Sequence, residues 1–499
     1  MSIAITINDK EYQGQAGQTV MEIAKANDIY IPHFCWHPGL SVAGVCRFCM
    51  VAVEGRPKLE IACNLPLAEG MKIYTANAEV EEAHKWALEF HLINHPLDCP
   101  ICDQAGECGL QDYYMEVGKY PSQMQADKVL KPKALDVGTD LVLDTERCIL
   151  CSRCVRFEEE VTKTSALGIF DRGDRSIIGT YKDKKIDHNY TTNLVDICPV
   201  GAFTSKDFRF QKRVWFTEEV NSICPGCSTG CAVELAFNRK LQRYYRVKPR
   251  ASEVNGQWMC NFGRTVYKHL NVEKRLLTSQ VWDEAKGKQQ ALATSQVLAQ
   301  LAAKLAVAQK IGVLVACQYT NEEYRSLFSY FAKLNASFWQ WRSDSEDRTA
   351  FDGILMRGDR NANSGGFEGE LQKLDLQSSG GFADFCANSF DVAIVLAPEL
   401  PNTFANIELQ LQKLQALPFV SMWSCASVML AYSYQQLVAM RVFTEKQGSF
   451  TNYDGRVQPL PQTMAALNQN CVDVSAAVAL LQVSAHDDQV SNHDSQQGA

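Results

Sequence analysis

Four groups of four potential metal ligands lie before residue 261 of this chain. Fifteen of the 19 cysteines and one histidine fall into these groups, at spacings typical of iron–sulfur sites. The first set is Cys35, Cys46, Cys49 and Cys63; the second is His95, Cys99, Cys102 and Cys108; the third is Cys148, Cys151, Cys154 and Cys198; and the fourth is Cys224, Cys227, Cys231 and Cys260. A chain that holds four iron–sulfur clusters in series is most simply interpreted as a conductor of single electrons.

The first set has the spacing Cys-x10-Cys-x2-Cys-x13-Cys. Cys35, Cys46 and Cys49 lie in one long predicted loop, whose backbone N–H groups can donate hydrogen bonds to the sulfurs. Plant-type ferredoxins have the shorter spacing Cys-x4-Cys-x2-Cys, so the longer loop points to a different branch. Four thiolates also suit a structural zinc ion. The β-rich surroundings favour a [2Fe–2S] cluster.

The second set has the spacing His-x3-Cys-x2-Cys-x5-Cys. Three cysteines leave a [4Fe–4S] cluster one ligand short, and imidazole is an acceptable ligand for iron. We therefore predict that His95 is the fourth ligand. His91, one helical turn earlier, is the alternative. A neutral imidazole in place of a thiolate makes the site less negative, which by itself raises its reduction potential.

The third set is Cys-x2-Cys-x2-Cys, followed after 43 intervening residues by Cys198-Pro199. In two-cluster ferredoxins the cysteine before a proline binds the other cluster. Because no second run precedes Cys198, we predict one [4Fe–4S] cluster in a fold whose relatives hold two.

The fourth set has the spacing Cys-x2-Cys-x3-Cys-x28-Cys. It resembles the N-terminal cluster segment of molybdenum and tungsten enzymes that use a bis-pterin cofactor, and favours a [4Fe–4S] cluster over zinc. The other cysteines, which lack mutual spacing, are predicted to be buried core residues; they are Cys317, Cys386, Cys425 and Cys471.

Composition and charge narrow the possible functions. With 499 residues the chain is long enough for several domains, and its formal net charge of -8 gives no support to nucleic-acid binding. No basic-then-apolar leader precedes the strand-like Ser2–Asn8, and no apolar run approaches the roughly 20 residues of a membrane helix. We therefore expect a cytosolic, reduced and metal-loaded protein. Four arginines beside the sets could offset cluster charge: Arg47, Arg147, Arg153 and Arg156.

The elements that position these sets follow from hydrophobic periodicity. Residues 1–78 are predicted to form two strands, a helix capped by Thr19 and further strands, which matches a β-grasp ferredoxin domain. Residues 79–118 open with a helix that Pro96 ends, so that His95 lies at the helix end. A linker, residues 119–137, precedes two further cluster modules at 138–210 and 217–273.

After residue 273 the pattern becomes an alternation of strands and helices, which predicts a parallel α/β sheet. The predicted strands are Ile311–Ala316, Val392–Leu396 and Phe419–Trp423, and the predicted helices are Gln296–Gln309, Asn321–Leu334 and Ile407–Leu417. This domain is expected at 274–483, followed by a polar, disordered tail at 484–499. The fold class is therefore α+β and multidomain.

The four sets in this order resemble the large iron–sulfur subunit of bacterial NADH:quinone oxidoreductase, respiratory complex I. The motifs HPLDCPICDQAGECGLQD and RCILCSRCVRF carry the resemblance best. Farther on, TEKQGSFTNYDGRVQ (Thr444–Gln458) is similar to a segment of the molybdopterin-enzyme superfamily, and RGDRNANSGG (Arg357–Gly366) resembles a relic of its pterin loop. The C-terminal part is far shorter than in molybdopterin enzymes and lacks an evident catalytic metal ligand. It is therefore expected to be a truncated domain without functional molybdopterin.

The resemblance implies an electron-transfer subunit of an oxidoreductase whose whole complex translocates protons. A flavin- and NADH-binding partner would supply electrons, which would pass through the [2Fe–2S] centre, then the third-set and second-set centres. A two-cluster [4Fe–4S] partner would carry them on towards quinone. The fourth cluster would be an inheritance off this route. Other peripheral-arm subunits are implied, with a location on the cytoplasmic side of the bacterial inner membrane and no direct membrane span.

No Gly-x-Gly-x-x-Gly follows a strand, so the chain itself is expected to conduct electrons without an NADH- or quinone-reacting site.

Three other interpretations stay open at this point. An iron–sulfur subunit of an NAD-linked hydrogenase or of a formate dehydrogenase is the main alternative. The sparse later cysteines argue against a hydrogenase catalytic cluster, and the long C-terminal part argues against the shorter electron-transfer subunit of an NAD-linked hydrogenase. A formate dehydrogenase would need a full pterin domain. A zinc-stabilised scaffold is disfavoured by His95 and by Cys198-Pro199.

Overall fold

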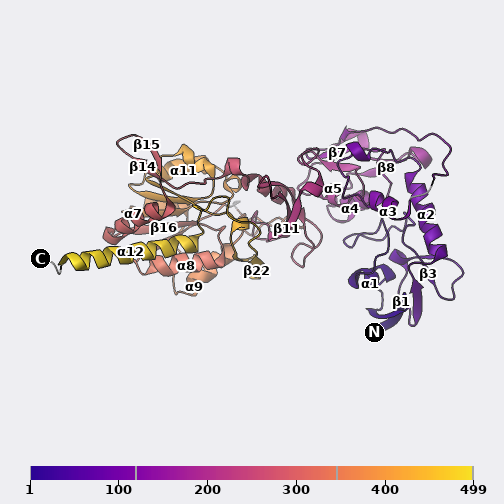
Figure 1. Cartoon of the computed structure of the whole chain (residues 1–499), viewed down its shortest axis with the longest axis horizontal. Coiled ribbons are helices and arrows are strands. Elements are labelled where there is room, and N and C mark those ends of the chain that lie inside the picture. The colour runs from indigo at the N-terminus through magenta and orange to yellow at the C-terminus, as the bar shows by residue number, and fades with distance from the viewer. Residues whose placement is uncertain (1, 119–120, 344–346, 497–499) are drawn as a thin grey trace. The chain divides into compact units, whose positions relative to one another are not determined.

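The computed structural model describes residues 2–118, 121–343 and 347–496 (Figure 1). It divides into two compact units, Met1–Thr217 and Glu218–Ala499. Of the predicted linker, residues 119 and 120 lie outside the described residues, and residues 121–134 contain neither helix nor strand. Among the described residues, no helix combines the length and the apolar character that a membrane span requires.

The first unit begins with a five-stranded mixed sheet and one helix. The elements are β1 (Ser2–Ile7), β2 (Lys10–Gln15), α1 (Val20–Ala26), β3 (Met50–Val53), β4 (Glu60–Ile61) and β5 (Met71–Tyr74), with the sheet order β2-β1-β5-β3-β4. β1 pairs antiparallel with β2 and parallel with β5. The Thr19 side chain caps α1 by accepting from the amide of Glu22, as predicted. Val20 and Ile23 of α1 pack with Ile5 and Ile7 in a core that also contains Cys49 and Cys63.

The remainder of the first unit consists of short elements joined by long loops. Its helices are α2 (Ala78–Leu92), α3 (Gly109–Val117), α4 (Arg153–Glu160) and α5 (Asn193–Ile197); its strands are β6 (Leu135–Asp136), β7 (Leu141–Leu143), β8 (Gly168–Phe170), β9 (Ile177–Gly179) and β10 (Phe203–Ser205). β10, β7 and β6 form one sheet, and β8 and β9 a hairpin. Asn77 caps α2, which ends at Leu92, so His95 follows the helix end as predicted.

The second unit begins with a three-stranded antiparallel sheet of β11 (Glu218–Ile223), β12 (Ala232–Asn238) and β13 (Arg243–Pro249). The short helix α6 (Asn261–Arg264) follows. A hairpin near the chain's end, β21 (Gly448–Thr451) and β22 (Val457–Leu460), belongs to the same unit and pairs antiparallel.

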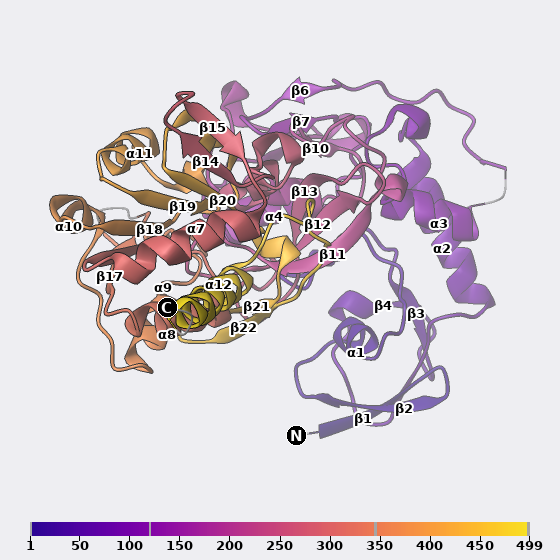
Figure 2. The same cartoon turned by 60° about the vertical axis from the view of Figure 1, so that its left-hand side comes forward.

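A seven-stranded sheet forms the body of the second unit, in the order β15-β14-β20-β19-β18-β16-β17 (Figure 2). The strands are β14 (Gln280–Asp283), β15 (Lys288–Ala291), β16 (Ile311–Ala316), β17 (Ser337–Trp341), β18 (Val392–Leu396), β19 (Val420–Ser424) and β20 (Gln436–Ala439). β17, β16, β18, β19 and β20 pair parallel, which confirms the predicted parallel sheet. The antiparallel edge of β14 and β15 was not predicted, because each strand has only four residues and β15 is mostly polar.

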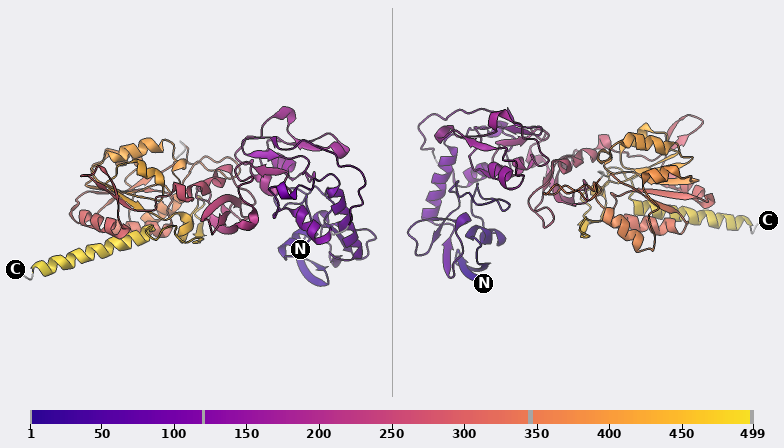
Figure 3. Two further views of the ribbon diagram at one scale, coloured as in Figure 1. Left: turned by 45° about the horizontal axis from the view of Figure 1, so that its top comes forward. Right: turned by 180° about the vertical axis from the view of Figure 1, so that it is seen from behind.

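Helices cover both faces of this sheet (Figure 3). They are α7 (Thr294–Val307), α8 (Asn321–Ala332), α9 (Ser364–Gln372), α10 (Phe382–Ala387), α11 (Ile407–Gln415) and α12 (Val474–Gln496). α12 packs against α7 and α8, while α11 lies on the opposite face (Figure 1). Opposite faces are expected because the crossover from β16 to β17 and that from β18 to β19 run in opposite directions across the sheet.

The C-terminal helix differs from the sequence-based expectation. Helix α12 continues to Gln496, into the segment predicted as a disordered tail, and its end projects beyond the body of the unit (Figure 3). No proline or glycine occurs between residues 484 and 496 to end a helix that is already nucleated by packing. Residues 497–499 lie outside the described part.

Candidate functional site

The structure brings the four cysteines of the first set together. All four are buried, although Cys35 and Cys63 lie 28 residues apart in the chain. The Cys35 thiol shares hydrogen bonds with those of Cys46 and Cys63, and Cys49 shares one with Cys63. Hydrogen bonding with Cys46 lowers the pKa of Cys35, and backbone N–H groups of Val45 and Cys46 contribute. The long loop therefore presents amides to sulfur, as predicted.

The second set lies in the turn-rich segment between α2 and α3. Cys99 begins the short 3-10 helix Cys99–Ile101 and is exposed, whereas Cys102 and Cys108 are buried. Burial raises the pKa of Cys108 to about 12, and its thiol also interacts electrostatically with Cys102. Gly201, from another loop, packs directly against the Cys102 sulfur. A Cβ added to Gly201 would lie only 2.2 Å from that sulfur.

His95 has the free, buried nitrogen that a metal ligand needs. Its ring shares a hydrogen bond with the backbone of Arg147, while Nδ1 is buried without a hydrogen-bond partner among the described residues. Burial lowers the pKa of His95 to about 4, so the imidazole is neutral near pH 7. A buried ring nitrogen without a partner destabilises the folded state unless it binds something, and a neutral imidazole nitrogen is a suitable metal ligand.

The alternative ligand, His91, contacts its own helix and the aromatic residues of the first-set loop. Its Nδ1 lies 2.6 Å from the carbonyl oxygen of Ala87, one turn back on α2. Its ring packs on Phe34 at 4.8 Å between centroids, and on Phe48 at 5.9 Å. These contacts belong to the loop that carries the first set. The geometry therefore favours His95 over His91 for the second set.

The third set is built around the N-terminus of α4. Cys148 and Cys151 lie in the preceding loop, Cys154 lies on α4, and Cys198 follows α5. The Leu150 amide donates a hydrogen bond of 3.3 Å to the Cys148 sulfur. Burial raises the pKa of Cys151 to about 11, and the nearby Cys198 thiol contributes. Electrostatic interactions also join Cys154 to the other three thiols.

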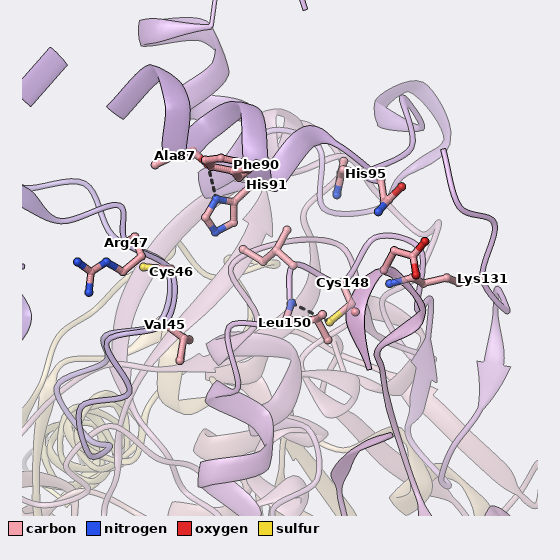
Figure 4. A pocket seen from close by; sticks show the side chains of 14 residues that line it. Val45, Cys46, Arg47, Ala87, Phe90, His91, His95, Lys131, Cys148 and Leu150 are labelled. Atoms are coloured by element: carbon pink, nitrogen blue, oxygen red, sulfur yellow. Dashed lines mark hydrogen bonds between the residues drawn. The ribbon is translucent and has the colours of Figure 1, made fainter. Parts of the chain in front are cut away.

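A pocket of about 370 Å³ touches three of the sets at once. Cys46 of the first set, His95 of the second and Cys148 of the third all line it (Figure 4). His91 and Lys131 also contribute to its wall. Residues far apart in the sequence are therefore neighbours around one space.

Direct contacts also join the second and third sets. The Gly109 amide, beside Cys108, donates to the carbonyl of Pro199, beside Cys198, at 3.1 Å. The thiols of Cys108 and Cys198 interact electrostatically.

Arg147 contributes positive charge at the second set. Its buried guanidinium donates to Asp98 at 3.0 and 3.2 Å and interacts electrostatically with the Cys102 thiol. Arg153 and Arg156 lie at the third set, whereas Arg47 is exposed.

The fourth set is entirely within the second unit and all four of its cysteines are buried. The Cys224 amide donates to the carbonyl of Cys231 at 2.8 Å, and Gly263, in the helix that Cys260 caps, donates to the Cys260 sulfur at 3.5 Å. A Cβ on Gly263 would lie 2.9 Å from the Cys224 sulfur, so a glycine is required for this approach.

Two distant segments brace the fourth-set loop. The Ser228 amide donates to the carbonyl of Asp359 at 3.0 Å, and its carbonyl accepts from Tyr453 at 2.9 Å. The Gln458 side chain donates to the carbonyl of Gly230 at 2.8 Å. Asp359 and Tyr453 lie in the two segments that resemble molybdopterin enzymes. These segments therefore contact the loop that carries the fourth set.

The described part holds no three His, Cys, Asp or Glu side chains gathered tightly enough for a single metal ion. Ligands of an iron–sulfur cluster are held apart by the cluster itself, so they need not converge on one point. The shared burial and electrostatic contacts of each set are therefore the more relevant observations.

Several residues that shape the site have no signal in the sequence. Arg213 donates to the carbonyls of Pro100 and Cys102 at 2.6 and 2.5 Å across a separation of 111 residues or more. The close approach of Gly201 to Cys102 is equally non-local. Of the four remaining cysteines, Cys317, Cys425 and Cys471 are buried as predicted and Cys386 is half-buried.

A buried ionic cluster in the second unit is a further feature that the sequence pattern does not indicate. Lys446 pairs with Glu323 at 2.7 Å and, in a very short contact, with Glu399. Nearby, Arg275 pairs with Glu445 at 2.8 Å. All these side chains are buried, and each pair joins distant parts of the chain.

Four family models match the parts of the chain that contain the four sets. Residues 1–78 match the 2Fe-2S iron-sulfur cluster binding domain, 85–121 the NADH-ubiquinone oxidoreductase-G iron-sulfur binding region, 138–204 the ferredoxin-like domain of NADH-quinone oxidoreductase subunit 3, and 217–272 the molybdopterin oxidoreductase Fe4S4 domain. The curated G subunit of the NADH-quinone oxidoreductase of Streptomyces coelicolor is 35% identical over 337 residues, 66% of this chain and 39% of that protein. The chain is a homologue of these G subunits.

Two further curated G subunits of NADH-quinone oxidoreductases are similar to this chain. That of Rickettsia bellii is 35% identical over 294 residues, covering 57% of this chain and 43% of the relative. That of Mycobacterium bovis is 33% identical over 337 residues, which cover 66% of this chain and 42% of the relative. The matches span about two fifths of the length of these curated relatives. A solved NAD⁺-reducing [NiFe]-hydrogenase chain is 30% identical, with a TM-score of 0.39, covering 43% of this chain and 92% of that one.

Proposed function

We propose that this chain is an electron-transfer subunit of an NADH:quinone oxidoreductase whose whole complex translocates protons. Cys35, Cys46, Cys49 and Cys63 would hold a [2Fe–2S] cluster. Three [4Fe–4S] clusters would be held by His95, Cys99, Cys102 and Cys108; by Cys148, Cys151, Cys154 and Cys198; and by Cys224, Cys227, Cys231 and Cys260. The matched 2Fe-2S and Fe4S4 domains support these assignments.

The observation that carries the proposal is the contiguity of three sets in the first unit. The Gly109–Pro199 hydrogen bond joins the second set to the third, and one pocket is lined by a member of each. Bound there, the clusters would supply reversible one-electron transfer. The chain's own residues hold the sets close together, bury most of their thiols and place Arg147 where it offsets negative charge.

The proposed partners follow from the homology. A flavin- and NADH-binding subunit would deliver electrons, and a two-cluster [4Fe–4S] subunit would receive them, within a peripheral arm on the cytoplasmic side of the inner membrane. The names of the relatives, which are G subunits of NADH-quinone oxidoreductases, support membership of such an assembly.

We propose a structural role for the fourth cluster and no pterin site. The segment Arg357–Gly366 resembles a pterin loop, and several of its polar side chains have partners within the protein, although Arg357 Nε, Arg360 Nη1 and Ser364 Oγ are buried without a hydrogen-bond partner among the described residues. Asn363 donates to the carbonyl of Tyr319 at 2.8 Å, and Asn361 donates to Asp359 at 2.7 Å. Arg357 stacks on the ring of Tyr453 at 3.2 Å. These bonds support the interpretation that the segment holds the fourth-set loop in place. The segment belongs to a proposed truncated molybdopterin-oxidoreductase-like domain at 274–483.

Metal and sulfide analysis of the natively purified chain tests the proposal. One [2Fe–2S] and three [4Fe–4S] clusters predict about 14 iron atoms per chain, with as much acid-labile sulfide. Two or more equivalents of zinc in place of iron would refute it, because thiolates also bind zinc.

A further inference from the structure

Two arginines of α4 contact the first and the third set at the same time. One nitrogen of Arg156, Nη2, donates to the carbonyl of Cys35 at 2.6 Å and, more weakly, to that of Cys151 at 3.4 Å. Its other terminal nitrogen donates to the carbonyl of Ser41 in the first-set loop. A single buried guanidinium therefore links the backbones of two thiol residues from different sets.

Arg153 makes a similar bridge through the neighbours of the cysteines. Its Nη2 donates to the carbonyl of Trp36, next to Cys35, at 2.6 Å. Its Nη1 donates to the carbonyl of Ile197, next to Cys198, at 3.1 Å. The third nitrogen, Nε, is buried and has no hydrogen-bond partner within the described residues.

A third contact ties the same two elements together. The backbone and side chain of Ser41 both donate to Glu160, the last residue of α4, with the amide bond at 2.8 Å. The first-set loop is thus attached to both ends of α4. Both arginines lie on the helix that these attachments hold.

The charge of Arg153 acts on both sets. Its guanidinium interacts electrostatically with the thiols of Cys151 and Cys198 and with those of Cys35 and Cys46. Arginine keeps its charge under all ordinary conditions. A fixed positive charge stabilises the more negative, reduced form of a nearby redox centre, and does so more strongly where water is excluded.

We propose that Arg153 and Arg156 are positioning residues that hold the first centre against the third, and that Arg153 raises the reduction potentials of both centres together. Electron transfer between the two centres would then depend on α4 for its spacing, and the reduction potentials of both centres would depend on the charge of Arg153. This inference rests on the proposed iron–sulfur function.

The test is a redox titration of the purified holoprotein, with both centres followed by electron paramagnetic resonance. Arg153→Met removes the charge and both hydrogen bonds, and Arg153→Lys keeps the charge but cannot bridge two carbonyls in the same way. Arg47→Met is the matched control, because Arg47 adjoins Cys46 but is exposed, where water screens its charge.

We expect Arg153→Met to lower the midpoint potentials of both centres, Arg153→Lys to lower them less, and Arg47→Met to leave both close to the native values. Arg153→Met with full iron content and unchanged potentials would overturn the inference, as would a shift confined to the third-set centre. If Arg153→Met loses iron, Arg153→Gln, which removes the charge but keeps hydrogen-bond donors, takes its place: unchanged potentials in an iron-loaded Arg153→Gln refute the proposal and a joint decrease supports it. Absence of iron from the native protein would instead refute the proposed function.

Discussion

The amide of Gly109 donates a hydrogen bond to the carbonyl of Pro199 at 3.1 Å. This bond fastens the start of α3, beside Cys108, to the loop that follows Cys198. Two residues farther along that loop, Gly201 lies against the sulfur of Cys102. The Cys-Pro loop of the third set is therefore also a wall of the second.

The contact at Gly201 predicts a local defect in a variant. In Gly201→Ala the added Cβ would lie 2.2 Å from the Cys102 sulfur and 3.1 Å from the Gln104 Cβ, so the Cys102 loop must move. We expect loss of the second-set centre, with iron falling to about 10 atoms per chain. Gly109→Ala is the control, since its nearest contact would be an ordinary 3.7 Å. Full iron content in Gly201→Ala would contradict this prediction.

The free nitrogen of His95 predicts distinct outcomes for three variants. His95→Cys should retain a [4Fe–4S] centre but lower its potential, because a thiolate stabilises the oxidised form. His95→Ala should lose or open the centre, whereas His91→Ala should keep it. Electron paramagnetic resonance of each variant gives the answer. An unchanged spectrum in His95→Ala, with loss in His91→Ala, would show that the assignment is wrong.

The buried carboxyl of Glu399 predicts a pH-dependent stability. Burial raises the pKa of Glu399 to about 7 from its ordinary 4.5, against the attraction of Lys446. The folded state therefore holds the proton of Glu399 more tightly than the unfolded state does. The resulting stabilisation is complete below pH 4.5 and is lost as the pH rises through 7.

Thermal unfolding of the full chain between pH 5 and pH 8 measures this effect. We expect Glu399→Gln to reduce the pH dependence of the midpoint temperature, because glutamine has no proton to lose, by an amount equivalent to roughly 3 kcal/mol over the whole range. An identical pH dependence in the native chain and in Glu399→Gln would eliminate Glu399 as its source.

Local sequence signals were sufficient for much of the fold. The Thr19 cap, the end of α2 before Pro96, and the apolar strands β16, β18 and β19 all depend on neighbouring residues. The grouping of thiols at fixed spacing likewise depends on short loops. The four sets, and the elements that flank them in the sequence, could therefore be recognised without a structure.

Contacts between residues far apart in the chain could not be predicted from the sequence pattern. Nothing in the spacing of Arg156 indicates that it reaches Cys35, 121 residues earlier, and nothing near Gly201 indicates its approach to Cys102. The ionic cluster of Lys446 depends on segments that meet only in the folded unit. Its charged residues look like ordinary surface residues in the sequence.

The most direct test of the account compares Cys151→Ala with Cys224→Ala by NADH-to-quinone turnover per fully assembled complex. Cys151 lies in the contiguous sets of the first unit, whereas Cys224 lies in a set braced by the C-terminal domain, where cluster binding is coupled to folding. We predict that Cys151→Ala abolishes turnover. Cys224→Ala should lower assembly and thermal stability but leave most turnover in the complexes that form. Equal loss of turnover in assembled complexes of both variants, or normal turnover in Cys151→Ala, would contradict the account.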